Sequence, residues 1–185
     1  MYYFNETELF LCIIFQKRNE KMKFFTADIC DAYKEDVQVL HSGYRSYGGA
    51  ERFAGPIRTL KLVRNNYELI HLLKEPGEGA VAVVDVGAEY WAVVGENLIK
   101  FARDNGWAGI LVHGYVRDIH VTVTVPVGLL ALGTCPRKSF ESNEGIRETE
   151  LSFGGVTFRP GDWLFADEDG AVVVEKSLAE EIVRS

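Results

Sequence analysis

The fold is decided by the stretch Gly109-Ile-Leu-Val-His-Gly-Tyr-Val-Arg-Asp118. Its apolar start has the composition of a buried strand, which we expect to stop at His113. Gly114 then lets the backbone turn, because glycine has no Cβ to oppose the turn. Arg117 and Asp118 follow where a sheet presents side chains to solvent, and this is where α/β folds usually carry their chemistry.

The residues before this stretch predict a strand, a helix and a second strand in parallel. Residues 80–86 (AVAVVDV) form a continuous apolar run, which indicates a strand covered on both faces. A helix is expected from Glu96 to Arg103, ending at Asn105-Gly106. Such a crossover unit places the start of the helix and the end of the next strand at one edge of the sheet. Glu96 and the Arg117-Asp118 pair are therefore expected to converge.

The flanking segments add further elements to the same α/β domain. Helices are expected over residues 28–33, capped by Thr26, and over residues 67–74, capped by Asn66. Ser177 opens a capping box and so predicts a C-terminal helix. Gly55-Pro56 is expected to break or edge its strand, and Tyr47-Gly48-Gly49 to form a turn. Strands are expected over residues 52–63, 121–132, 151–158, 162–166 and 171–175.

The composition bounds the class of protein. A chain of 185 residues, 47% of them hydrophobic, can form one domain with a substantial core. The net charge of −7 argues against direct nucleic-acid binding, which needs clustered cations. Cys12, Cys30 and Cys135 include no C-x-x-C pair, so they suggest neither a disulfide framework nor a zinc site. A reducing cytoplasm is the expected location.

The N-terminal residues are expected to lie outside the core fold. Leu9 to Phe15 is an apolar run far shorter than a bilayer span, so no membrane association is expected. Acidic residues precede this run and basic residues follow it, which is the reverse of a secretory signal. Met22 comes just before the first predicted helix. We therefore expect residues 1–23 to be an extension and residues 24–185 to form a single domain.

Most chemical motifs are absent from the sequence. It contains no phosphate-binding glycine motif and no G-x-S-x-G elbow. The acidic turn at residues 167–170 lacks the later ligands of a calcium loop and is expected to join two strands. His113, at the end of a buried strand, is expected to be a core histidine, whereas His120 could reach Asp118.

One candidate site is left. Glu96 opens a helix, where free backbone N–H groups can bind an anion. Asp118 could hold a divalent metal, and Arg117 could hold a substrate carboxylate or enolate. The alternative, a surface arginine and aspartate after a strand, stays open on the dipeptide alone.

Motifs spread over residues 24–183 resemble the family of the regulator of ribonuclease E activity A (RraA), which is related to the class II 4-hydroxy-4-methyl-2-oxoglutarate aldolases. They occur in the family's order and cover nearly the whole core. The motifs are residues 26–31 (TADICD), 53–57 (FAGPI), 83–85 (VVD), 95–98 (GENL), 106–109 (GWAG), 114–118 (GYVRD), 136–139 (PRKS), 153–157 (FGGVT), 160–162 (PGD) and 166–170 (ADEDG).

The resemblance implies a swivelling β/β/α three-layer fold and a ring-shaped homotrimer with sites between subunits. In the aldolase branch an acid, twenty intervening residues and an Arg-Asp pair mark the site, and Glu96 and Arg117-Asp118 match this pattern. Carried over, Asp118 would anchor Mg²⁺ or Mn²⁺. Arg117 would bind the 2-keto acid and stabilise its enolate, with Glu96 as the second catalytic residue.

The backbone of Gly95, Glu96, Asn97 and Leu98 would hold the substrate carboxylate in this scheme. The implied reaction releases pyruvate from 4-hydroxy-4-methyl-2-oxoglutarate, and the same electron sink implies oxaloacetate decarboxylation. The sequence departs from the family at Val121, where a further acid is expected. Val121 begins a segment (VTVTV) that we expect to be a strand. The loop from Val86 to Trp91 is also bulkier than the family's glycine-rich segment.

Two other functions are compatible with the resemblance. One is a regulator that binds and inhibits ribonuclease E without catalysis. The negative net charge suits such a partner, because its RNA-binding segments are basic. The regulator branch commonly lacks the intact Arg-Asp pair, which this chain has, so the enzyme is favoured. The other is a trimeric fold that has lost its chemistry, for which Val121 is the main argument.

Overall fold

The structure is a computed structural model that describes residues 24–184, so the predicted N-terminal extension lies outside the described residues. Strand β3 (Phe53–Lys61) joins the two halves of the main sheet. Its first residues pair antiparallel with β11 (Trp163–Ala166), and from Ile57 onward it pairs parallel with β4 (Val81–Asp85). The change of partner follows Gly55-Pro56. The strand therefore does not break at Gly55-Pro56 but continues and changes its neighbour there. Pro56 has no N–H to donate to a neighbouring strand.

The main sheet has the order β1-β12-β11-β3-β4-β6-β7-β2. Strands β3, β4, β6 and β7 run parallel, and the parallel pair of β4 and β6 confirms the predicted crossover unit. Two short strands lie off this path, β5 (Ala92–Val94) on β6 and β8 (Ile146–Arg147) on β3. The other bounds are β1 (Gln38–Val39), β2 (Arg45–Ser46), β6 (Gly109–Val116), β7 (Gly128–Thr134), β12 (Ala171–Val174), and a separate hairpin of β9 (Leu151–Phe153) and β10 (Val156–Phe158).

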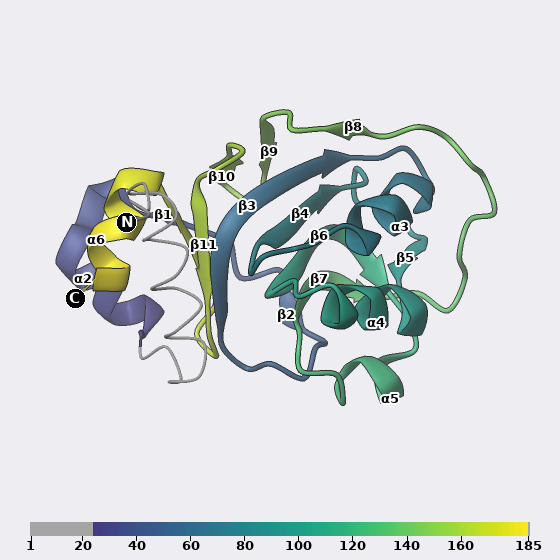
Figure 1. The fold of residues 1–185 in the computed structure, drawn as a ribbon, viewed down its shortest axis with the longest axis horizontal. Coiled ribbons are helices and arrows are strands. Elements are labelled where there is room, and N and C mark those ends of the chain that lie inside the picture. The colour runs from purple at the N-terminus through teal and green to yellow at the C-terminus, as the bar shows by residue number, and fades with distance from the viewer. Residues whose placement is uncertain (1–23, 185) are drawn as a thin grey trace, which may run out of the picture.

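Alternation along the strands divides the interior into three apolar layers. On β11, Trp163 and Phe165 face helices α2 (Thr26–Tyr33) and α6 (Lys176–Arg184), whereas Leu164 faces the β9–β10 hairpin. Because successive strand residues point to opposite faces, the two faces of the sheet pack against two different cores. Figure 1 shows α2 and α6 at one end of the molecule and α3 (Tyr67–Lys74) and α4 (Glu96–Asp104) against the parallel strands. This is the predicted β/β/α architecture.

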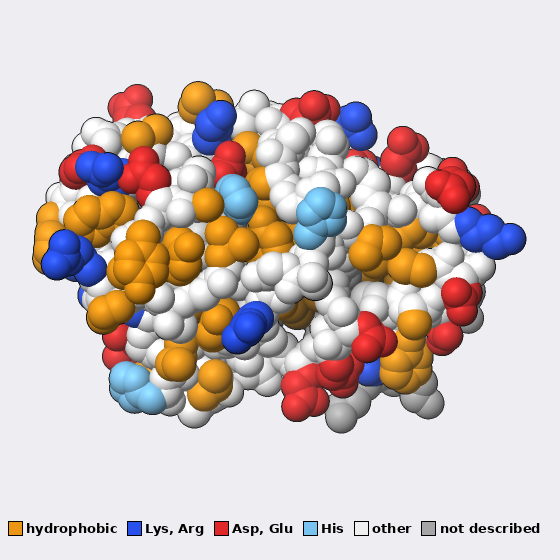
Figure 2. Space-filling model, turned by 180° about the vertical axis from the view of Figure 1, so that it is seen from behind, with side chains coloured by type: hydrophobic (Ala, Val, Ile, Leu, Met, Phe, Trp, Pro, Cys, Tyr) orange, Lys and Arg blue, Asp and Glu red, His pale blue; other side chains and the backbone are white. Residues whose placement is uncertain are grey.

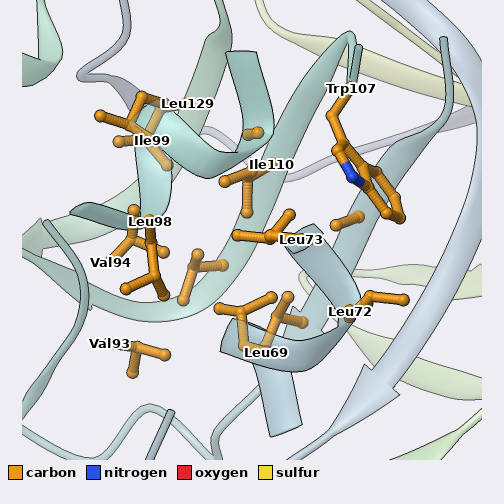
Figure 3. Close-up of a cluster of buried hydrophobic side chains, with 14 of the residues drawn as sticks. Leu69, Leu72, Leu73, Val93, Val94, Leu98, Ile99, Trp107, Ile110 and Leu129 are labelled. Carbon is orange, nitrogen blue, oxygen red and sulfur yellow. The ribbon is translucent and has the colours of Figure 1, made fainter. Parts of the chain in front are cut away.

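The largest core lies between the parallel strands and helices α3 and α4. Leucines of α3 and α4 meet valine and isoleucine side chains of the strands, and Trp107 closes one end (Figure 3). The members labelled there are Leu69, Leu72, Leu73, Val93, Val94, Leu98, Ile99, Trp107, Ile110 and Leu129, and all are buried. Burial of these side chains fixes α4, and with it the residues at its N-terminus, on the sheet.

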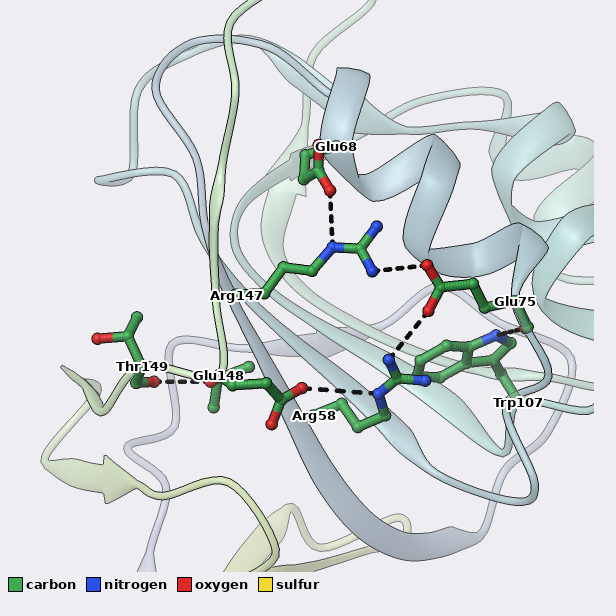
Figure 4. Close-up of polar contacts among 8 residues, drawn as sticks. Arg58, Glu68, Glu75, Trp107, Arg147, Glu148 and Thr149 are labelled. Carbon is green, nitrogen blue, oxygen red and sulfur yellow. Dashed lines mark hydrogen bonds and ion pairs between the residues drawn. The ribbon is translucent and has the colours of Figure 1, made fainter.

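A network of ion pairs fastens β8 to α3 and β3 (Figure 4). Arg147 reaches Glu68 at 2.7 Å and Glu75 at 2.6 Å. Glu75 also pairs with Arg58 at 3.1 Å, and the guanidinium of Arg58 lies over the Trp107 ring. The hydrogen bond from Arg147 leads the causes that lower the pKa of Glu75. The network therefore links the long segment after β7 to the rest of the sheet.

Two predictions at the centre of the sequence are wrong. Strand β6 does not stop at His113 but continues through Gly114 to Val116. Gly114 is needed for packing, because a Cβ there would lie 2.3 Å from Cγ2 of Val86. Residues 121–132 are not one strand: helix α5 (Ile119–Thr122) comes first, and β7 begins only at Gly128. The alternating β-branched residues mimicked a strand, but the N–H groups of α5 bond to the carbonyl of Asp118.

Two predicted helix caps also differ. Thr26 lies inside α2, and its backbone N–H and its hydroxyl both donate to the Asp167 carboxylate, each at 2.7 Å. Helix α6 begins at Lys176, one residue before the predicted cap Ser177. Asn66 is the N-cap of α3 as expected, but Asn65 supplies the side-chain bond, to the N–H of Tyr67.

None of the helices in residues 24–184 is long and apolar enough to cross a membrane.

Candidate functional site

The start of α4 and the end of β6 lie side by side. Strand β5 pairs parallel with the last residues of β6, and the N–H of Arg117 donates to the carbonyl of Val94 at 2.9 Å. Gly95 follows as the N-cap of α4, and Glu96 is the first helical residue. The structure thus brings Glu96 together with Arg117 and Asp118, as the crossover unit predicted from the sequence.

Gly95 makes this approach possible. A Cβ on Gly95 would lie 2.6 Å from Oδ2 of Asp118 and 3.1 Å from Cγ of Arg117. Both distances are shorter than van der Waals contact allows, so any side chain here would push Arg117 and Asp118 away. The φ angle of Gly95 is −150°, an extended conformation open to any residue. Close packing, not backbone conformation, therefore requires the glycine.

Asp118 adopts a left-handed conformation, with φ 56° and ψ 36°. Outside glycine this conformation costs of order 1–3 kcal/mol and persists only where surrounding contacts enforce it. The carbonyl of Asp118 accepts hydrogen bonds from the N–H groups of Val121 and Thr122. Its carboxylate Oδ2 accepts from the N–H of Glu96 at 3.3 Å and lies 3.5 Å from Nε of Arg117. About one third of the Asp118 side chain (34%) is exposed, so the carboxylate is open to solvent.

The start of α4 can bind an anion through its backbone. The first N–H groups of a helix have no intrahelical acceptor, and the helix dipole favours negative charge there. The N–H of Glu96 is used by Asp118, which leaves those of Asn97 and Leu98. The Leu98 side chain is buried in the core, so only its backbone can contribute. The Glu96 carboxylate pairs with Lys100 at 2.5 Å, one turn along the helix.

The donor set can be tested against a divalent metal. Within residues 24–184, no three His, Cys, Asp or Glu side chains come together as a metal-binding group. A zinc site, which needs three or four protein ligands, therefore does not fit. Mg²⁺ and Mn²⁺ fit better, because Mg²⁺ usually keeps several waters and is bound by one or two carboxylates. The described contacts of the Asp118 carboxylate use Oδ2, so Oδ1 is the atom that could hold such a cation.

The residues that departed from the family pattern have structural explanations. Val121 is a residue of α5 that is partly buried and packs against the largest core, so its apolar side chain helps to hold α5 on that core. His120 is exposed on α5. The bulky loop before β5 places Trp91 within 5.7 Å of the guanidinium groups of both Arg64 and Arg137. Trp91 and Arg64, with Glu89 and Ser139 among others, line a small hollow beside β5.

His113 is a partnered histidine on the other face of the sheet. Its Nδ1 shares a 2.7 Å hydrogen bond with the hydroxyl of Tyr44, and its ring stacks on Phe153 at 4.6 Å. Burial lowers the pKa of His113, although the charge of Asp85 acts in the opposite direction. The prediction of a core histidine agrees with this packing.

Fold and site together define an α/β protein with a helix N-terminus and an Arg-Asp pair at the carboxyl edge of its parallel strands. The sequence profile of a known family, described as "RraA-like: Aldolase/RraA", matches residues 26–173. The chain belongs to this RraA-like family.

Relatives in the family carry several names. A protein of Laribacter hongkongensis named "putative 4-hydroxy-4-methyl-2-oxoglutarate aldolase" is 49% identical over 152 residues, which cover 82% of this chain and 96% of that protein. The RNA-processing inhibitor RraA from Thermus thermophilus is 41% identical, with a TM-score of 0.78 over 83% of this chain and 93% of that one. A Geobacillus kaustophilus structure described as an S-adenosylmethionine:2-dimethylmenaquinone methyltransferase is 38% identical, with a TM-score of 0.80 over 84% and 98% of the two chains.

Proposed function

We propose that the protein is a divalent-metal-dependent aldolase that cleaves 4-hydroxy-4-methyl-2-oxoglutarate and related 2-keto acids to pyruvate, with oxaloacetate decarboxylation as a side activity. The observation that carries the proposal is the convergence of Arg117, Asp118 and the N-terminus of α4. The aldolase names of the relatives support the same reaction class.

Each group has a task in this reaction. The free N–H groups at the start of α4 would bind the substrate carboxylate. Arg117 touches Asp118 through Nε, so the terminal nitrogens of its guanidinium can stabilise the negative charge that forms on the enolate oxygen. Glu96 would accept the proton of the 4-hydroxyl as the bond between C3 and C4 breaks. A Mg²⁺ or Mn²⁺ ion held by Asp118 would act as a Lewis acid toward the 2-keto oxygen.

The proposal extends to the assembly of the protein. We propose a homotrimer with sites between subunits, as the family resemblance implies. Figure 2 shows apolar side chains gathered across the middle of one face of the molecule, as expected of a surface that another subunit covers.

The test is pyruvate release from oxaloacetate and from 4-hydroxy-4-methyl-2-oxoglutarate, with Mg²⁺ and after chelation. Asp118→Asn keeps the shape of the side chain and removes its charge, so we expect kcat/KM to fall at least about 100-fold. Asp169→Asn is the matched control, because Asp169 is an exposed aspartate in the β11–β12 turn. Pyruvate release that is unaffected by chelation, or full activity in Asp118→Asn, would contradict the proposal.

A second candidate function is the inhibition of a ribonuclease. It is favoured by the similarity to the RNA-processing inhibitor from Thermus thermophilus, and the net charge of −7 suits a basic partner. Asp118→Asn separates the two functions, because binding to a large basic surface should survive the loss of one charge. If wild type and Asp118→Asn bind ribonuclease E equally at low salt and neither releases pyruvate, the regulator is correct and the enzyme is not.

A further inference from the structure

Thr122 is a fully buried polar residue at the end of α5, with 0% of its surface exposed. Its hydroxyl donates a 2.6 Å hydrogen bond to the backbone carbonyl of Tyr47, 75 residues earlier in the chain. A buried hydroxyl without a partner would cost of order 1–3 kcal/mol, so this contact restricts the position of α5 relative to the Tyr47 loop. The backbone N–H of the same residue donates to the carbonyl of Asp118 at 3.1 Å. Thr122 is thus bonded both to a distant loop and to the candidate metal ligand.

The loop that holds the Tyr47 carbonyl is itself fixed. The N–H of Tyr47 donates to the carbonyl of Leu129 in β7 at 2.7 Å. The next two residues pack against the backbone that leads into β7. A Cβ on Gly48 would lie 2.2 Å from the carbonyl oxygen of Val127, and one on Gly49 would lie 2.4 Å from that of Val125. These glycines, expected from the sequence to mark a turn, therefore serve close approach, and the carbonyl is a rigid acceptor.

We propose that Thr122 is a positioning residue for Asp118. Its bond to Tyr47 holds α5, the first turn of α5 holds the carbonyl of Asp118, and Asp118 is thereby kept in its left-handed conformation. In that conformation its carboxylate lies against Gly95 and the N–H of Glu96. Loss of the Thr122 hydroxyl should let Asp118 relax and its carboxylate move. The part of this inference that concerns metal binding rests on the proposed function.

The test compares Thr122→Val with Thr122→Ser. Valine keeps the shape of threonine but cannot donate to Tyr47, whereas serine restores the hydroxyl. We expect Thr122→Val to bind Mn²⁺ about tenfold more weakly than wild type, measured by electron paramagnetic resonance of the free ion, and Thr122→Ser to bind like wild type. In the metal-free protein, the amide proton of Glu96 should exchange faster in Thr122→Val, because its acceptor Asp118 is no longer held.

Thr59→Val provides a matched control for stability. Thr59 is also fully buried, and its hydroxyl donates to the carbonyl of Thr149 at the same 2.6 Å, on strand β3 away from the site. Its loss should lower the free energy of unfolding like Thr122→Val but leave Mn²⁺ binding and Glu96 exchange unchanged.

Each outcome has a distinct meaning. The positioning role would be overturned if the amide proton of Glu96 exchanged no faster in Thr122→Val than in wild type. It would also be overturned if Thr59→Val showed the same faster Glu96 exchange and weaker Mn²⁺ binding as Thr122→Val. A wild-type protein that binds no Mn²⁺ would overturn the proposed function, while faster Glu96 exchange in Thr122→Val would still establish the positioning of Asp118.

Discussion

At the scale of single residues, Gly95 gives the sharpest prediction. Alanine at this position would place a Cβ 2.6 Å from Oδ2 of Asp118, so the carboxylate must move away from the N–H of Glu96. We expect Gly95→Ala to lose pyruvate release at least about tenfold, because displacement of a ligand by even about 1 Å is costly for catalysis. Gly43→Ala is the control, since the nearest atom to its Cβ is 3.9 Å away. Steady-state kinetics on both variants measure the effect, and equal activity would show that the close approach is irrelevant.

The residues of the candidate site differed in how far the sequence could predict them. Arg117, Asp118 and Glu96 were found because they follow a strand or open a helix, and both positions can be located from periodicity. The need for glycine at position 95 could not be predicted, because it arises from side chains beyond the next helix and strand. The role of Thr122 depends on a carbonyl 75 residues away, and no local pattern encodes that contact.

At the scale of elements, errors occurred where one pattern is compatible with two structures. Alternating valine and threonine after His120 satisfied the strand pattern, but Val121 and Thr122 are the last two residues of α5, because Asp118 starts a helical turn. Conversely, Gly114 looked like a strand end but lies inside β6, where Val86 leaves no room for a Cβ. The continuous apolar run of β4 and the helix α4, with its stop at Asn105-Gly106, were predicted well, because packing and local preference agree there.

The same scale predicts how β8 is held. Arg147 pairs with Glu68 and Glu75, of which Glu68 is the more buried at 19% exposure. Arg147→Met keeps the aliphatic packing and removes both ion pairs, so we expect a loss of about 1 kcal/mol in the free energy of unfolding. Arg159→Met is the control, because the pair between Arg159 and Glu150 is more than half exposed on both sides. Urea unfolding measures both variants, and equal losses would mean that the network adds nothing beyond a surface pair.

At the scale of the whole molecule, three apolar layers pack on one sheet. Their arrangement determines where the candidate site at the start of α4 lies. The layer under α3 and α4 fixes the helix start, and the opposite layer, under the β9–β10 hairpin, holds His113. The sequence predicted the three-layer fold through its family resemblance, not through periodicity. Strand β3 crosses between the two halves of the sheet, and such a change of partner leaves no signal except Gly55-Pro56.

The packing between these layers predicts a dependence of stability on pH. Burial lowers the pKa of His113 from its usual 6.5, so the folded protein binds this proton less tightly than the unfolded chain. Protonation therefore favours unfolding. The stabilising contribution is complete above about pH 6.5 and is lost as the pH falls through the lower pKa of the folded protein.

His113→Asn removes this titration while its side chain can still bond to the hydroxyl of Tyr44. Wild type should lose more stability than this variant between about pH 7.5 and about pH 5.5, as measured by urea unfolding at each pH. His71→Asn, at an exposed position on α3, should lose as much as wild type. Parallel pH profiles of the free energy of unfolding for wild type and His113→Asn would show that protonation of the stacked His113 imidazole does not cause the loss of stability.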